Sequence, residues 1–92
     1  MKSEIDKYVI NKIKQRRIEM GVSQKGMADI LGVTPGFIGQ IELERTNSRY
    51  SVHDIYLISR ELECEPSDFF PPLDSLEFQT DLMRKEKRSL KK

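Results

Sequence analysis

The chain has 92 residues, of which 37% are hydrophobic and 34% charged, and its formal net charge is +1. This length and composition are typical of one small globular domain with a modest core and unlike those of a disordered chain. An enzyme of this size, with a catalytic cleft of its own, would be unusual.

Three absences bear on where the protein works. No apolar run approaches the roughly 20 residues that a membrane span requires. The opening residues, MKSEIDKYVI, lack the uninterrupted apolar stretch of a secretory signal. The single cysteine, Cys64, cannot form an internal disulfide. We therefore expect a cytoplasmic protein without membrane contact.

The first predicted helix covers residues 5–20. Ile10 and Ile13 recur at helical spacing, with basic residues around them. Arg17 falls on the same inward face, seven residues after Ile10, where an apolar residue would be expected. Gly21 supplies the residue type that commonly follows a helix C-terminus.

A second and a third helix follow closely. Ser23 is a favourable N-cap for the second helix, which Gly32 ends. Its apolar face consists of Met27, Ala28 and Leu31. Thr34-Pro35 starts the third helix, because threonine caps a helix and proline suits its first position. This helix is predicted to run to about Glu44, followed by a polar loop over residues 45–50.

A fourth helix is predicted after Ser51, where Ser51-Val52-His53-Asp54 forms a capping-box pattern. Its inward face is expected to hold Val52, Ile55, Ile58 and Leu62. Residues 66–70 offer one more short turn of helix, which Pro71-Pro72 ends. Five short helices with short connections predict a compact all-α bundle over residues 1–72. Residues 73–92 are expected to form a basic C-terminal tail, flexible or weakly helical.

The second and third predicted helices form the pattern of a helix-turn-helix. The linking glycine, Gly32, permits a sharp reversal, and Val33 is expected to fill the angle between the helices. Ala28 is small enough for the helices to approach closely. In this geometry the second helix of the pair projects far enough to enter a DNA groove about 12 Å wide.

The sequence closely resembles the Cro/phage-repressor (XRE-like) helix-turn-helix family. The run Val22-Ser23-Gln24-x-x-Met27-Ala28-x-x-Leu31-Gly32-Val33-Thr34, followed by Ile38-x-x-Ile41-Glu42, carries the resemblance, which covers roughly residues 8–70. It implies a five-helix, lambda-repressor-like DNA-binding domain. It also implies a homodimer that regulates transcription from a palindromic operator in double-stranded DNA.

The outer face of the third helix is the candidate DNA-contact surface. A helical wheel places Gly36, Phe37 and Gln40 on this face, opposite the apolar one. Gln40 is expected to reach base edges, and Phe37 to contact thymine methyl groups or the sugar-phosphate wall. With Pro35 and Gly36 at early positions, direct readout is sparse and DNA shape carries more of the specificity. The plainer alternatives are a solvated Gln40 and a Phe37 that packs within the protein.

Further DNA contacts are expected around this helix. Gln24 occupies the position at which the family anchors a phosphate through a side chain and a helix N-terminus. The complete set of DNA-binding candidates is Gln24, Thr34, Gly36, Phe37, Gln40, Arg45, Asn47, Ser48 and Arg49. The resemblance also implies a structural ion pair between Arg17 and Glu42, which ties the first helix to the recognition helix.

Charge is unevenly distributed along the chain. Residues 1–51 carry nine Lys/Arg and six Asp/Glu, residues 52–80 carry one and seven, and residues 81–92 carry six and two. This division suggests a DNA-facing first half and a solvent- or partner-facing second half. The plainer alternative is that these runs are solvated surface.

Catalysis and cofactor binding find no support in the sequence. His53 and Cys64 are the only His and Cys, and neither a metal-ligand cluster nor a phosphate-binding glycine loop is present. The acidic residues between 61 and 68 are expected to be solvated, without a metal. The alternative function is that of an antitoxin-like or accessory protein whose residues 73–92 bind a protein partner. The plainer alternative is that this tail is a disordered, solubilising end. A further alternative is that its basic cluster, Arg84–Lys92, adds nonspecific affinity for phosphates.

Overall fold

Each α-helix of the computed structural model, which describes residues 2–75, begins at a hydroxyl side chain. The elements are α1 (Glu4–Glu19), α2 (Gln24–Leu31), α3 (Pro35–Glu42), α4 (Val52–Glu61) and a 3-10 turn, η1 (Pro66–Phe69). Their N-caps are Ser3, Ser23, Thr34 and Ser51, each of which accepts a hydrogen bond from the backbone N–H three residues later. These bonds satisfy amide donors that have no partner inside the helix. The predicted caps of α2, α3 and α4 are therefore confirmed.

The expectation of a fifth α-helix was wrong. Residues 66–69 form a single 3-10 turn, and the backbone at Phe70 is already extended (φ −104°, ψ 150°). Two adjacent prolines follow Phe70; they lack the N–H groups that would continue a helix, and the residue before a proline avoids helical geometry. The described residues are otherwise all-helical, as predicted. None of their helices is long and apolar enough to cross a lipid bilayer.

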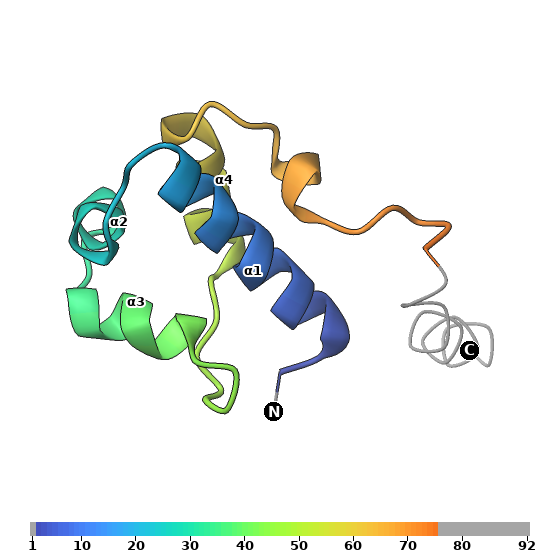
Figure 1. Ribbon diagram of the computed structural model, residues 1–92, viewed down its shortest axis with the longest axis horizontal. Helices are drawn as coiled ribbons and strands as arrows, with labels where there is room; N and C mark the ends of the chain where they lie inside the picture. The colour runs from blue at the N-terminus through green and yellow to red at the C-terminus, as the bar shows by residue number, and fades with distance from the viewer. Residues whose placement is uncertain (1, 76–92) are drawn as a thin grey trace.

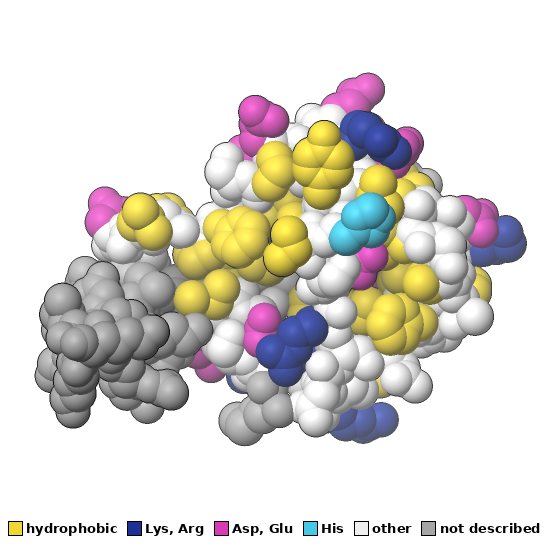
Figure 2. Space-filling view, turned by 180° about the vertical axis from the view of Figure 1, so that it is seen from behind, with side chains coloured by type: hydrophobic (Ala, Val, Ile, Leu, Met, Phe, Trp, Pro, Cys, Tyr) yellow, Lys and Arg dark blue, Asp and Glu magenta, His cyan; other side chains and the backbone are white. Residues whose placement is uncertain are grey.

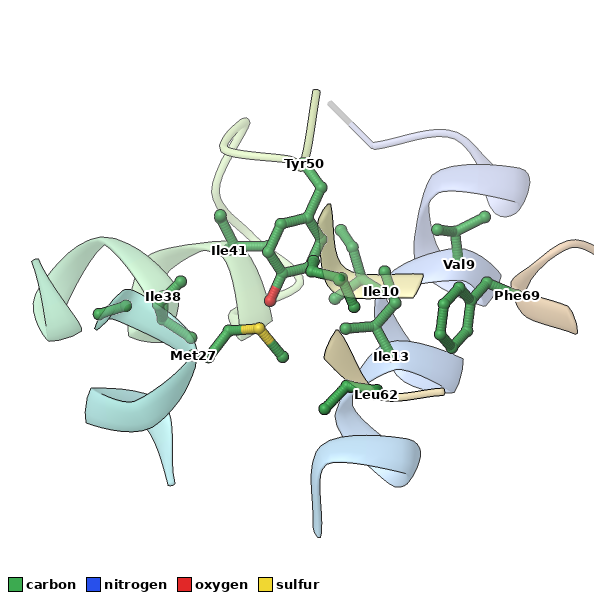
Figure 3. Close-up of a cluster of buried hydrophobic side chains, with 11 residues drawn as sticks. Val9, Ile10, Ile13, Met27, Ile38, Ile41, Tyr50, Leu62 and Phe69 are labelled. Atoms are coloured by element: carbon green, nitrogen blue, oxygen red, sulfur yellow. The ribbon is translucent and has the colours of Figure 1, made fainter. Parts of the chain in front are cut away.

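The core lies where α1, α2, α3 and α4 converge, with η1 covering its far end (Figure 1; Figure 3). Its buried members are Val9, Ile10, Ile13, Met27, Ala28, Ile38, Ile41, Tyr50, Ile58, Leu62 and Phe69. Removing these side chains from water supplies most of the driving force for folding. Because α2 and α3 are short, the shared core, more than helix propensity, keeps them folded.

Two residues near the start of α4 were misplaced in the prediction from the sequence, one in the preceding loop and one at the first position of the helix. Tyr50, expected in a polar loop, is only 7% exposed, whereas Val52, expected to face the core, is 86% exposed. The chain carries Tyr50 inward and then passes through an extended Ser51, so the first residue of α4 points outward. The inward face of α4 begins at Ile55, which lines the same shallow apolar pocket as Tyr50.

The hydroxyl of Tyr50 is an unusual feature of this core. It points among buried side chains (Figure 3), and it is buried without a hydrogen-bond partner among residues 2–75. Burial, with the nearby Glu42 carboxylate, raises the pKa of Tyr50 well above its ordinary value. The ring therefore contributes through packing, and its hydroxyl opposes folding.

Tyr50→Phe is expected to leave the free energy of unfolding unchanged or to raise it by about 1 kcal/mol, because it removes an unsatisfied polar atom. Tyr50→Ala should lower it by about 3 kcal/mol or more through loss of the ring. Urea denaturation of both variants measures these effects. A clear loss of stability in Tyr50→Phe would mean that the hydroxyl has a partner.

The predicted C-terminal tail, residues 73–92, lies largely outside the part of the chain that the structure describes. Leu73 is exposed, and residues 76–92 are not among those that the structure describes.

Candidate nucleic-acid interface

A left-handed glycine sets the angle between α2 and α3. Gly32 ends α2 with φ +69°, a conformation that L side chains rarely adopt. The following residue, Val33, donates its backbone N–H back to the carbonyl of Ala28 at 3.0 Å. This pattern closes α2 and turns the chain directly into the Thr34 cap of α3. Val33 is partly exposed, so it fills the angle between the helices less completely than predicted.

The two faces of α3 differ as the helical wheel predicts. Ile38 and Ile41 are fully buried against α2 and the rest of the core. Gly36, Phe37 and Gln40 are exposed. A Cβ atom built on Gly36 would meet nothing within 4 Å, so another molecule can approach the backbone closely there. These three residues thus lie on the exposed face of α3, a helix at the edge of the molecule (Figure 1).

The ion pair between Arg17 and Glu42 is present, with two parallel hydrogen bonds. Arg17 donates from Nε to Glu42 Oε2 at 2.8 Å and from Nη2 to Oε1 at 2.9 Å. Its Nη1 donates to the carbonyl of Val22 at 2.9 Å. Only 10% of the Arg17 side chain and 5% of the Glu42 side chain are exposed. The pair therefore links α1, the connection between α1 and α2, and the end of α3 with little competition from water.

Gln24 joins this ion pair. Its Nε2 donates to Glu42 Oε1 at 3.0 Å, so the first residue of α2 is tied to the last residue of α3. The Gln24 side chain also lies over Gly39, where a Cβ atom would come within 3.6 Å of Oε1. The residue is exposed, and its amide is held in place between the two helices.

The surroundings of Glu42 stabilise its charged form. Burial acts to raise the pKa of this carboxyl, but hydrogen bonds from Arg17 and Gln24, with the charges of Arg17 and Lys14, outweigh it and hold the pKa below its ordinary value of 4.5. The resulting stabilisation is complete above the pKa of the unfolded chain. It is lost as the pH falls through the lowered pKa of the folded protein.

Helix α3 ends at Glu42, two residues before the predicted end. Leu43 is extended (φ −85°, ψ 119°), and the Thr46 hydroxyl faces the carbonyls of Gln40 and Leu43. The Lys2 ammonium also caps this end, by donating to the carbonyls of Ile41 at 2.8 Å and of Leu43. These contacts replace the next turn of helix.

The remaining candidate DNA contacts, in the loop after α3, differ in their exposure and in their contacts within the protein. Arg45 and Asn47 are exposed, and Ser48 is partly buried. Arg49 is exposed but forms an ion pair with Asp6 at 2.8 Å. This loop therefore has exposed polar groups near α3, and Arg49 is partly committed to the protein itself.

Sequence reasoning missed the role of Lys2. Its partners lie 39 to 44 residues away, and no local pattern signals such a contact. For Tyr50 a signal did exist: an apolar residue just before a serine N-cap commonly packs on the fourth residue of the helix, here Ile55.

Comparison with protein families gives one match. A family model described as helix-turn-helix matches residues 13–69. The matched segment begins within α1 and ends with η1, and so includes the ion pair and all of α2 and α3. No curated protein matches the chain.

Removing either partner of the buried ion pair is expected to strand a charge. Arg17→Met or Glu42→Gln alone should lower the free energy of unfolding by about 3 kcal/mol or more. The double variant should lose less than the sum of the two, with a coupling energy of at least about 1 kcal/mol. Denaturant titrations at low temperature provide the free energies of unfolding of the wild type, the two single variants and the double variant. Additive losses would mean that the pair has no energetic coupling.

Proposed function

The chain belongs to the Cro/repressor (XRE-like) helix-turn-helix family, and from this membership we propose that it is a sequence-specific regulator of transcription that binds double-stranded DNA. The observation that carries the proposal is the exposed outer face of α3, which presents Gly36, Phe37 and Gln40 beside the exposed start of α2. An α-helix fits into the major groove of DNA, where the edges of all four base pairs are distinguishable.

Within this proposal, Gln40 reads a base edge. Its amide offers one donor and one acceptor group, which match the N7 and N6 atoms of adenine. Phe37, 37% exposed, supplies an apolar contact for a thymine methyl group. Gly36 allows the helix backbone to lie close to the groove wall, so that the shape of the DNA contributes to specificity.

Phosphate contacts are proposed on both sides of α3. Gln24 and Thr34 lie at the exposed starts of α2 and α3, where backbone N–H groups and the helix dipole favour an anion. Arg45 and Asn47 extend this surface into the loop that follows α3. Such contacts fix the orientation of the protein on the duplex without reading its sequence.

A homodimer on a palindromic operator is part of the proposal. One short helix contacts few base pairs, and two half-sites one helical turn apart multiply the affinity. Phe69 is buried in the core and Phe70 is exposed, so only Phe70 of this pair is accessible to a second copy. The face that carries α4 shows several separate groups of hydrophobic side chains and few basic ones (Figure 2).

The alternative function, partner binding in the manner of an antitoxin, depends on residues 73–92. Most of that segment lies outside the described residues, and no feature of residues 2–75 favours it over DNA binding.

Selection of bound sites from random duplexes tests the proposed function. We expect the full chain to enrich a two-fold symmetric motif with half-sites about one helical turn apart. Gln40→Ala should relax the preference at one position of each half-site, at a cost of about 1–3 kcal/mol. Gln15→Ala, which removes an exposed glutamine from α1, is the matched control and should leave the motif unchanged.

Two results would contradict the proposal. One is the absence of any enriched motif at low ionic strength. The other is a motif that Gln40→Ala and Gln15→Ala leave equally intact.

A further inference from the structure

Lys2 is a buried lysine that no part of the proposed DNA contact uses. The residue is only 3% exposed. Its ammonium group donates to the carbonyl of Ile41 at 2.8 Å, to the carbonyl of Leu43, and to Thr46 Oγ1 at 3.2 Å. A lysine ammonium has three N–H donors, so these contacts use all of them. Lys2 therefore has no N–H left for a phosphate.

The partners of Lys2 explain why a charge is held there. The last carbonyl groups of a helix have no partner inside it and carry the negative end of the helix dipole. A cation at this end is favourable, although burial lowers the pKa of Lys2, as does the charge of Arg49. The ammonium group of Lys2 thus interacts with the end of α3 instead of with solvent.

The same amino-terminal residues hold the loop that follows α3. Thr46, bound by Lys2, directs its own hydroxyl to the carbonyl of Gln40. Lys7 forms an ion pair with Glu44 at 3.4 Å, and Asp6 with Arg49 at 2.8 Å. Figure 1 shows the N-terminal end of the chain beside this loop. Residues 2–7 thus fix the end of α3 and the loop from one side.

We propose that Lys2 is a positioning residue for DNA recognition. It fixes the place where α3 ends and the course of the following loop, so that Gln40 and the loop residues Arg45 and Asn47 meet one duplex together. This inference rests on the proposed function, and it adds a residue that acts on the recognition surface from the inside. When the contacts that support a binding site are lost, the residues that touch the ligand are still present, but they are held less precisely and the site becomes less specific.

The test compares a duplex that the wild-type protein selects with a scrambled duplex of equal length. Lys2→Met keeps an unbranched side chain one atom shorter and removes its charge and donors. Arg60→Met removes an exposed cation from α4, which takes no part in the proposed DNA contact, and controls for net charge. Dissociation constants are measured at a temperature at which circular dichroism shows each variant to be folded. Lys2→Met should weaken binding to the selected duplex about tenfold and affect the scrambled duplex no more than Arg60→Met does.

A second variant covers the case in which Lys2→Met does not fold. Thr46→Val removes one partner of Lys2 and the hydroxyl that faces the Gln40 carbonyl, and leaves the lysine with its two backbone acceptors. It should lower the preference for the selected duplex in the same direction by a smaller factor. Lys2→Arg, which keeps a cation at this position, should restore part of the preference.

The outcomes separate this inference from the function on which it rests. If the wild-type protein selects no duplex, the proposed function fails and the role of Lys2 fails with it. If the wild type selects a motif but folded Lys2→Met or Thr46→Val keeps the full preference, the role of Lys2 alone is overturned. Equal weakening on both duplexes would also overturn it, because it would indicate a plain phosphate contact.

Discussion

The buried carboxylate of Glu42 is the contact on which the arrangement of α3 depends. Arg17 of α1 binds both of its oxygens, and Gln24 of α2 binds one of them. A bidentate arginine–carboxylate contact fixes direction as well as distance. Two helices, α1 and α2, are therefore held to the last residue of α3, which sets the rotation of α3 and the side chains that it presents to solvent.

The other constraints on α3 act at its two ends. The helix is short and contains Gly36 and Gly39, which lower its intrinsic stability. At its start, the left-handed Gly32 and the Thr34 cap fix the entry of the chain. At its end, Lys2 and Thr46 take up the free carbonyl groups. A helix with a weak intrinsic preference is thus held rigidly by its surroundings, which is what a recognition surface requires.

The parts of this fold that the sequence predicted are those encoded by local signals. Ser23, Thr34 and Ser51 are recognisable as caps because their hydrogen bonds reach only three residues ahead, and the buried face of α3 follows from helical periodicity. The position of Arg17 on an apolar face was visible, but only the family resemblance gave its partner. Lys2 was missed because its partners are distant in sequence. The early end of α3 was missed as well; there Lys2 and Thr46 bind the last carbonyl groups in place of a further turn of helix. The prediction of a fifth α-helix was wrong because Pro71 and Pro72 leave room for only a single 3-10 turn before them.

The central claim is that the outer face of α3 is the surface that meets DNA. The most direct measurement is a titration of the full chain with a short duplex at low ionic strength, followed through the NMR amide shifts of each residue. The account predicts that the largest changes fall on residues 34–40, the start of α2 and residues 45–47, while α4 changes little. Changes concentrated on α4 and η1, with residues 34–40 unaffected, would contradict it.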